Sequence, residues 1–231
     1  MTTRPAGIVS TGMENLALLA RSDLFSAFDG DALDRLLIGA RSLRCERNQT
    51  IFDEGDEADE LFVVRSGRIA IGRRSVDGRE SLVALMEDGD VFGEMPLFDS
   101  GVRSASARSL EASEVLRIPF SLVRAELDAQ PNLLWDVVTL LAQRLRSTDS
   151  ALADAVFLDV TGRTAKRLLE LAGEDDEFVL PITQEELAGL VGASRERVNK
   201  SIAAFIRLGW IKQTDRRYRI IARDRLAQRS R

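Results

Sequence analysis

Residues 182–202 read ITQEELAGLVGASRERVNKSI, and this stretch decides the fold of the C-terminal part of the chain. Thr183 and Glu186 have the spacing of a capping box, in which the first side chain caps a helix and the second returns the hydrogen bond. The Gly-Ala pair that follows supplies a tight turn, and Ser194 caps a second helix. Two helices joined by a glycine-containing turn predict a helix-turn-helix motif.

The second helix of such a motif enters the major groove, where its N-terminal side chains reach base edges. Arginine can donate two hydrogen bonds to guanine, and glutamate can accept one from the cytosine amino group. The side chains that we expect at the DNA are Ser194, Arg195, Glu196, Arg197, Asn199 and Lys200. The opposite, apolar face anchors the helix and comprises Val198, Ile202, Phe205 and Ile206.

Charge is divided unevenly along the 231 residues, whose net charge is −5. Residues 1–159 hold 17 basic and 27 acidic side chains, whereas residues 194–231 hold 12 basic and 3 acidic ones. This split indicates an acidic module joined to one that binds a polyanion, although a solvated basic tail would give the same count. Residues 210–212 and 218–221 flank a polar turn and predict a hairpin wing, with Lys212, Arg216 and Arg217 near phosphates.

Composition excludes several kinds of site. The chain has no histidine and one cysteine, Cys45, so we expect no catalytic triad, no haem, no iron–sulfur cluster and no metal site, although composition alone leaves a site made only of carboxylates open. No nucleophile–base pair or phosphate loop is visible, which argues against an enzyme. No apolar run approaches the ~20 residues that cross a bilayer. The first residues lack a signal peptide, and we expect a cytoplasmic protein without a membrane partner.

The N-terminal half predicts helices followed by a small antiparallel barrel or sandwich. Residues 1–12 are expected to be a flexible tail, and residues 15–44 carry apolar positions at helical spacing. Four short apolar runs bounded by glycines then predict strands, at residues 61–64, 68–72, 81–85 and 113–118. The dipeptide Asp77-Gly78 is the firmest hairpin turn.

A heptad pattern follows the strands. Its positions, spaced by four and three residues, are Leu134, Val138, Leu141, Leu145, Thr148, Leu152 and Ala155. Such a seam predicts a long helix that pairs with its own copy, the alternative being a helix packed on its own barrel. The helix should end near Phe157, and residues 159–162 should form a hinge before another helix from Arg163 to Ala172.

Residues 89–107 interrupt the rhythm of the strands. A short helix after Gly93-Glu94 would present free N–H groups to an anion, and Arg103 could grip a phosphate beside the hydroxyl of Ser104. Glu94 would be unusual for a phosphate alone, but it would suit a sugar hydroxyl. The alternative is an Arg–Glu pair that merely holds the loop together.

Taken in order, three segments resemble the catabolite activator (CRP/FNR) family of bacterial transcription regulators: residues 92–107, 144–172 and 182–202. The resemblance implies an α+β protein. An antiparallel jelly-roll-like cyclic-nucleotide-binding domain would cover residues 13–130, a dimerisation helix 131–158, and a C-terminal winged helix-turn-helix domain 159–231.

The resemblance also implies which residues contact the nucleotide: Phe92, Gly93, Glu94, Met95, Arg103, Ser104, Arg144, Thr148 and Asp149. Asp149 departs from the serine that cAMP-responsive members often carry. Thr183 and Gln184 match contacts to the DNA backbone, and Arg195, Glu196 and Lys200 match base-reading positions, with lysine where arginine is usual. The wing lacks the glycine that many members have at its tip.

These observations predict a dimeric, sequence-specific DNA-binding transcription regulator gated by a cyclic nucleotide, with cAMP as its allosteric ligand. Its partners would be a palindromic double-stranded operator, a second copy of the chain and, for an activator, RNA polymerase. Two alternatives stay within the family, a cGMP-responsive member and an effector-independent one. A third, of another class, is a nucleotide-gated regulatory subunit of an enzyme.

Overall fold

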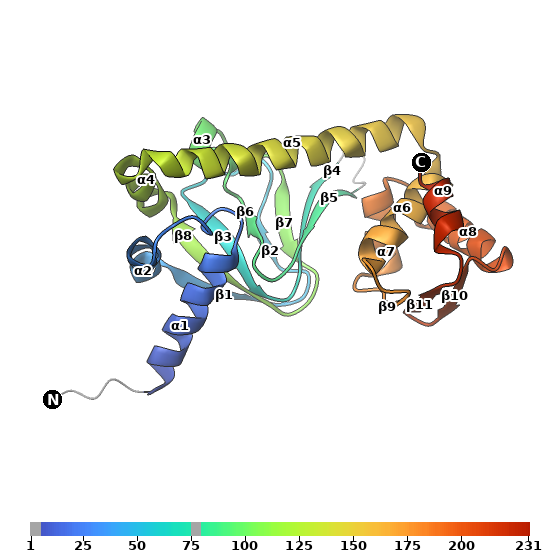
Figure 1. Cartoon of the computed structure of the whole chain (residues 1–231), viewed down its shortest axis with the longest axis horizontal. Helices are drawn as coiled ribbons and strands as arrows, with labels where there is room; N and C mark the ends of the chain where they lie inside the picture. The colour runs from blue at the N-terminus through green and yellow to red at the C-terminus, as the bar shows by residue number, and fades with distance from the viewer. Residues whose placement is uncertain (1–5, 75–79) are drawn as a thin grey trace. The chain divides into compact units, whose positions relative to one another are not determined.

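The computed structural model describes residues 6–74 and 80–231, so the predicted Asp77-Gly78 turn lies outside the described residues. The chain forms two compact units (Figure 1). The first comprises Met1–Arg73 and Val83–Arg144, and the second Arg74–Leu82 and Leu145–Arg231.

Two helices precede the strands, α1 (Ala6–Arg21) and α2 (Gly30–Gly39). Asp29 caps α2 by accepting a hydrogen bond from the Ala32 amide at 2.8 Å. The predicted flexible tail over residues 1–12 is therefore too long, because α1 already begins at Ala6. Once a helix is nucleated, each added residue gains one hydrogen bond, so a helix can begin before the residues whose spacing predicted it.

The predicted jelly-roll-like domain is confirmed as two four-stranded sheets whose described pairs are antiparallel (Figure 1). One sheet has the order β1 (Arg41–Cys45), β8 (Ser113–Pro119), β3 (Glu60–Ser66), β6 (Val91–Phe92). The other has the order β2 (Thr50–Phe52), β7 (Ser106–Ser109), β4 (Ile69–Arg74), β5 (Glu80–Met86). Side chains from both sheets meet in one core cluster, which includes Phe62, Phe92 and Ala107.

Helices α3 (Met95–Asp99) and α4 (Phe120–Ala129) and the 3-10 turn Pro131–Leu133 complete the first unit. A second core cluster lies beneath α1, α2 and α4 and includes Leu36, Phe25 and Val123. Val137 and Leu140 in the first turns of α5 (Leu134–Phe157) join this cluster. The predicted end of the long helix at Phe157 is confirmed.

The predicted hinge over residues 159–162 is shorter than expected. Helix α6 (Val160–Ala172) starts immediately after Asp159, whose carboxylate accepts a hydrogen bond from the Gly162 amide at 2.8 Å. An N-terminal cap of this kind lets the next three residues adopt helical geometry. Only Leu158 and Asp159 separate α5 from α6.

The rest of the second unit is a winged helix-turn-helix fold. Helices α7 (Gln184–Val191) and α8 (Arg195–Arg207) pack on α6. A three-stranded antiparallel sheet has the order β10 (Ile211–Thr214), β11 (Arg217–Ile220), β9 (Glu177–Val179), and α9 (Arg223–Arg229) ends the chain. The predicted hairpin wing is therefore present. On α8 the apolar face contains Val198, Ile202 and Phe205, whereas Ile206 is exposed, contrary to expectation, since Ser201 is buried instead.

Candidate functional site

Arg103 lies inside the barrel unit with only 4% of its surface exposed. One guanidinium nitrogen donates to the Gly93 carbonyl oxygen at 2.6 Å, and another donates to the Glu60 carbonyl oxygen at 2.8 Å. The guanidinium carbon lies 4.2 Å from the centre of the Phe52 ring and 5.4 Å from that of Phe62. Backbone carbonyls and aromatic faces thus hold this cation in place.

The charge of Arg103 is not balanced by a contacting acid. Among the described residues, no carboxylate lies within ion-pair distance of its guanidinium, and its Nε–H has no hydrogen-bond partner. Burial lowers the pKa of Arg103, while Glu60 and Asp59 oppose the shift from a distance. A guanidinium nevertheless stays protonated. Since an uncompensated buried charge is costly, this position favours a bound anion.

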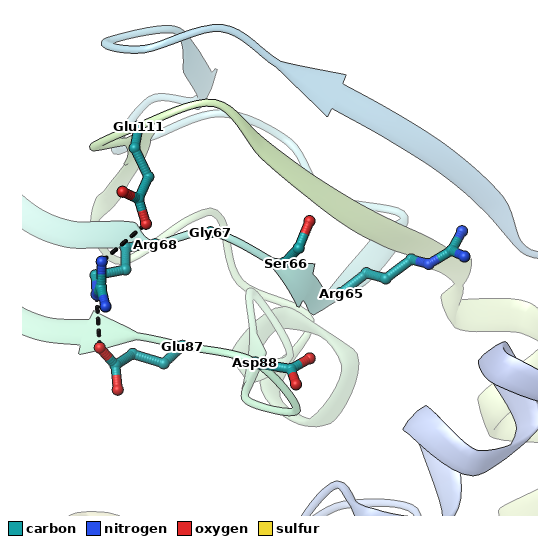
Figure 2. Close-up of a pocket in the computed structure, with 7 residues that line it drawn as sticks. All are labelled: Arg65, Ser66, Gly67, Arg68, Glu87, Asp88 and Glu111. Carbon is teal, nitrogen blue, oxygen red and sulfur yellow. Dashed lines mark hydrogen bonds and ion pairs between the residues drawn. The ribbon is translucent and has the colours of Figure 1, made fainter.

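A surface cavity elsewhere on the barrel provides a contrast (Figure 2). Its volume is about 340 Å³, and Arg65, Arg68, Glu87, Asp88 and Glu111 are among its lining residues. Arg68 pairs with Glu87 at 2.7 Å and with Glu111 at 2.9 Å. Arg65 also contacts carboxylates. The arginines of this cavity are neutralised by neighbouring acids, whereas Arg103 is not.

Glu94 lies beside the Arg103 site and is fully buried. Its Oε1 forms an ion pair with Arg144 of α5, which also donates to the Val91 carbonyl oxygen at 2.6 Å. Its Oε2 has no hydrogen-bond partner among the described residues. The alternative of an Arg103–Glu94 pair that only holds the loop is therefore not what the structure contains.

Gly93 connects these two side chains and needs to be glycine. Its φ of +74° lies in the left-handed region, and a Cβ atom there would lie 2.7 Å from a guanidinium nitrogen of Arg103. The structure thus brings Gly93, Glu94, Arg103 and Arg144 together, as the sequence predicted. Chemically, the site offers a cation with a free donor to an anion and a free carboxylate oxygen to a hydroxyl group.

The other predicted contacts are placed differently. Phe92 is buried and stacks on Phe62 with ring centres 5.1 Å apart, while Met95 and Ser104 are exposed. Thr148 and Asp149 are exposed on the part of α5 that belongs to the second unit, so their contact with a nucleotide stays a prediction.

Sequence reasoning missed the inner surroundings of Arg103, namely the rings of Phe52 and Phe62 and the carbonyl of Glu60. A backbone carbonyl leaves no signal in a sequence, and aromatic residues in a strand look like ordinary core. Among the described residues, no group of His, Cys, Asp or Glu side chains could hold a metal ion.

The helix-turn-helix motif is built by the caps that the sequence predicted. The Thr183 amide donates to Glu186 at 2.6 Å, and the Glu186 amide donates to the Thr183 hydroxyl at 3.2 Å. Gly192 takes a left-handed conformation with φ +66°, and the Ser194 hydroxyl accepts from the Arg197 amide at 3.4 Å. The start of α7, the turn after it and the start of α8 are therefore each stabilised by a cap or a left-handed glycine.

The exposed face of α8 carries the predicted reading residues: Arg195, Glu196, Arg197, Asn199 and Lys200. Within the described part of the chain, the three cations on this face have no ion pair, whereas other arginines of the unit do. Arg219 pairs with Glu177 at 2.8 Å, and Arg223 with Asp176 at 3.0 Å. The cations of α8 are thus available to an external polyanion.

The first helix of the motif is fastened to the wing. Gln184 donates to the Tyr218 hydroxyl at 2.7 Å, which engages the side chain predicted to contact the DNA backbone. In the wing, Arg216 donates to the Leu180 carbonyl oxygen at 2.9 Å, and Arg217 pairs with Glu177. Lys212 is exposed and has no ion pair among the described residues. Of the three predicted wing cations, Lys212 is thus the one best placed for a phosphate.

Comparison with known proteins identifies both units. Residues 42–130 match the cyclic nucleotide-binding domain family, and residues 162–229 match the Crp-like helix-turn-helix domain family. The CRP-like cAMP-activated global transcriptional regulator of Mycobacterium tuberculosis is 38% identical over 221 residues, which cover 93% of this chain and 99% of the relative.

Solved structures of regulators have a similar fold. FixK2 from Bradyrhizobium japonicum aligns with a TM-score of 0.76 and 19% identity over 83% of this chain and 98% of its own, which supports the fold alone. The c-di-GMP-responsive global regulator CLP of Xanthomonas campestris aligns with a TM-score of 0.72 and 26% identity over 83% of this chain and 99% of its own. Among the described residues, none of the helices is both long and apolar enough to span a membrane.

Proposed function

This chain belongs to the CRP/FNR family of transcription regulators, and we propose that it is a homodimer whose binding to a palindromic operator is controlled by cAMP. The family assignment, with its cyclic nucleotide-binding and helix-turn-helix domains, makes the chain a DNA-binding regulator rather than an enzyme. A cytoplasmic location follows from this proposal and stays a prediction. For an activator, so does a contact with RNA polymerase.

One observation carries the ligand proposal: a buried guanidinium without a contacting acid lies beside a buried carboxylate with a free oxygen. A cyclic nucleotide matches both groups. Its phosphate oxygens accept hydrogen bonds and compensate the charge of Arg103, and its ribose hydroxyl donates to Oε2 of Glu94. By resemblance to the family, Thr148 and Asp149 would lie near the base.

The name of the Mycobacterium tuberculosis relative favours cAMP over other nucleotides. Asp149 is the residue that bears on this choice, because an acid replaces the serine frequent in cAMP-responsive members. The relative from Xanthomonas campestris responds to c-di-GMP, so the same test should include cGMP and c-di-GMP.

The DNA proposal is supported by the exposed, unpaired cations of α8. Arg195, Glu196 and Lys200 would read base edges, while Thr183, Ser194 and Lys212 would contact phosphates. A ligand changes the affinity for DNA only if it binds one conformation of the chain better than another. Residues 158–159 connect α5 to α6, so a change in α5 on ligand binding would reach the DNA-reading domain through them.

The test is calorimetric titration with cAMP, cGMP and c-di-GMP, together with a gel shift on a palindromic DNA with and without each ligand. Arg103→Ala should abolish nucleotide binding and leave thermal unfolding cooperative. Arg68→Ala removes the same charge at the acid-lined cavity and should leave nucleotide binding unchanged.

Each alternative has its own outcome. Tight DNA binding without any nucleotide binding would identify an effector-independent member, and a preference for cGMP or c-di-GMP would replace cAMP as the ligand. Nucleotide binding without any DNA binding would favour a regulatory subunit of an enzyme. Unchanged nucleotide affinity in Arg103→Ala would show that the assigned pocket is wrong.

A further inference from the structure

The C-terminal helix α9 returns to the start of α6 after the wing. The two helices lie side by side within the second unit (Figure 1). Leu226, near the middle of α9, is fully buried. This helix is not part of the two-helix motif that reads DNA, so its place against α6 needs another explanation.

An ion pair joins the end of α9 to the junction between α5 and α6. The guanidinium of Arg229 contacts the carboxylate of Asp159, the residue that caps α6. The hydrogen bond from the Gly162 amide and the contact with Arg229 both lower the pKa of Asp159. A single side chain thus caps α6 and binds α9.

Gly162 provides the space for this contact. A Cβ atom there would lie 3.0 Å from the Arg229 carbonyl oxygen and 3.1 Å from a guanidinium nitrogen of the same residue. Gly162 has an ordinary helical conformation, and glycine costs about 1 kcal/mol within a helix. The close approach of α9 therefore accounts for a glycine that the helix itself does not need.

Other contacts tie the remaining sides of the junction. Arg163 donates to the Leu158 carbonyl oxygen at 2.7 Å and to the Val191 carbonyl oxygen at 2.8 Å. Lys166 of α6 pairs with Asp154 of α5 at 2.5 Å. These contacts link the junction to α5 and α7, and the Arg229–Asp159 ion pair links it to α9.

We propose that α9 is a strap that holds the α5–α6 junction in one geometry. The Arg229–Asp159 ion pair attaches α9 to the junction, and Gly162 leaves the space that this close approach needs. The strap would make the junction stiff, so that a change in α5 on ligand binding reaches α6 and the reading helix. This inference rests on the proposed function, because its role in regulation requires that a nucleotide controls DNA binding.

The experiment uses the full chain and four variants: Arg229→Gln, Asp159→Asn, the double variant, and Arg225→Gln as control. Asparagine is retained as an N-cap, so Asp159→Asn removes the charge but keeps the start of α6. Arg225 is exposed on the same helix and has no ion pair among the described residues. Fluorescence anisotropy on a palindromic DNA gives the increase in affinity that cAMP produces. Amide hydrogen exchange of residues 158–163 reports the junction directly, without DNA or ligand.

We expect Arg229→Gln and Asp159→Asn each to reduce the cAMP-induced increase in DNA affinity by about two- to fivefold, the range of a partly exposed ion pair. The double variant should lose no more than either single variant, since both remove one contact. Amide exchange at residues 158–163 should be faster in all three and unchanged in Arg225→Gln.

Wild-type exchange rates in Arg229→Gln and Asp159→Asn would overturn the strap, as would losses that add in the double variant. If exchange rises but the cAMP-induced increase stays at its wild-type value, the proposal is also overturned, because the strap then has no part in regulation. Failure of the proposed function is a separate result: the wild-type chain would bind no cAMP, while the exchange comparison would still test the strap.

Discussion

Arg103 and Glu94 are both buried, carry opposite charges and flank the same glycine, yet they form no ion pair with each other. Glu94 pairs with Arg144, and Arg103 bonds to two carbonyl oxygens. Each is left with one unpartnered polar atom. Leaving buried polar atoms unpaired costs stability, so their arrangement is better explained by a ligand than by the fold.

This arrangement predicts how a ribose hydroxyl is recognised. Glu94→Gln replaces the charged carboxylate by a neutral amide, and a hydrogen bond to a charged group contributes ~2 kcal/mol. The affinity for cAMP should therefore fall by roughly 30-fold, as measured by calorimetry. In the wild-type chain, 2′-deoxy-cAMP should lose a similar factor, whereas Glu94→Gln should hardly distinguish the two nucleotides.

Equal discrimination between cAMP and 2′-deoxy-cAMP in Glu94→Gln and in the wild type would contradict the ribose contact. Glu57→Gln is a suitable control, because Glu57 is exposed and has no ion pair among the described residues. It should leave the affinities for both nucleotides unchanged.

At the nucleotide site, the sequence predicted which side chains take part, but it did not predict the hydrogen-bond acceptors of Arg103. Gly93, Glu94, Arg103 and Arg144 were named from spacing and resemblance, and the structure brings them together. The carbonyl acceptors of Arg103 were not predictable, because they depend on how two distant strands meet rather than on side-chain type.

Among the elements, α8 carries the clearest specificity prediction. Lys200 is a point donor, whereas an arginine fork can bond both acceptors of guanine. Lys200→Arg should therefore raise the preference for guanine at one operator position by about tenfold, within the 1–3 kcal/mol of a bidentate contact.

Selection from a randomised DNA pool measures this preference. Arg207→Lys, at the exposed far end of the same helix, should leave the selected sequence unchanged. An unaltered sequence logo in Lys200→Arg would show that this face of α8 does not lie in the major groove.

Another element-scale prediction concerns the contact between α2 and α4. Arg35 donates to both oxygens of Glu126, at 2.7 and 2.8 Å, and these hydrogen bonds lower the pKa of Glu126 from its ordinary value of 4.5. A lowered pKa in the folded chain contributes stability that is present above the ordinary pKa and is lost as the pH falls below it.

Glu126→Gln should therefore reduce the free energy of unfolding at pH 7 and flatten its decrease as the pH falls below 4.5. Urea denaturation at several pH values measures both effects. A decrease as steep as that of the wild type would mean that another carboxylate governs acid sensitivity in this unit.

Element types were predicted more securely than their limits. Strands β2, β6 and β7 were not predicted, because they have two to four residues and too few alternating positions to form a pattern. Strand β1 was not predicted either, and the helical region expected to reach residue 44 ends at Gly39, before this strand. The start of α6 was misplaced because Gly162 resembled a helix breaker. The contact with α9 that explains this glycine involves a residue 67 positions away in the sequence.

At the scale of the whole molecule, α5 leaves a row of large apolar side chains exposed: Leu134, Trp135, Val138, Leu145, Leu152, Val156 and Phe157. Such a row is typical of an interface, and four of its members, Leu134, Val138, Leu145 and Leu152, follow the heptad spacing. The alternative of a helix packed only on its own barrel explains Val137 and Leu140, which are buried, but not these exposed residues. A second copy of the same helix would cover them.

Leu152→Glu places a charge within this row, where Leu152 is 64% exposed in the single chain. We expect the variant to sediment as a monomer, because a like charge from each copy would be buried at the seam. A monomer binds one half-site, so its affinity for a palindromic operator should fall by about 100-fold, the low end of what a paired binding site gains.

Ile38→Glu is the matched control, since Ile38 is 86% exposed on α2 and lies outside the row. If Leu152→Glu remains dimeric in analytical ultracentrifugation while Ile38→Glu does not, α2 rather than α5 forms the interface. If both variants remain dimeric with unchanged DNA affinity, the heptad row is not the surface through which two reading helices are held one DNA turn apart.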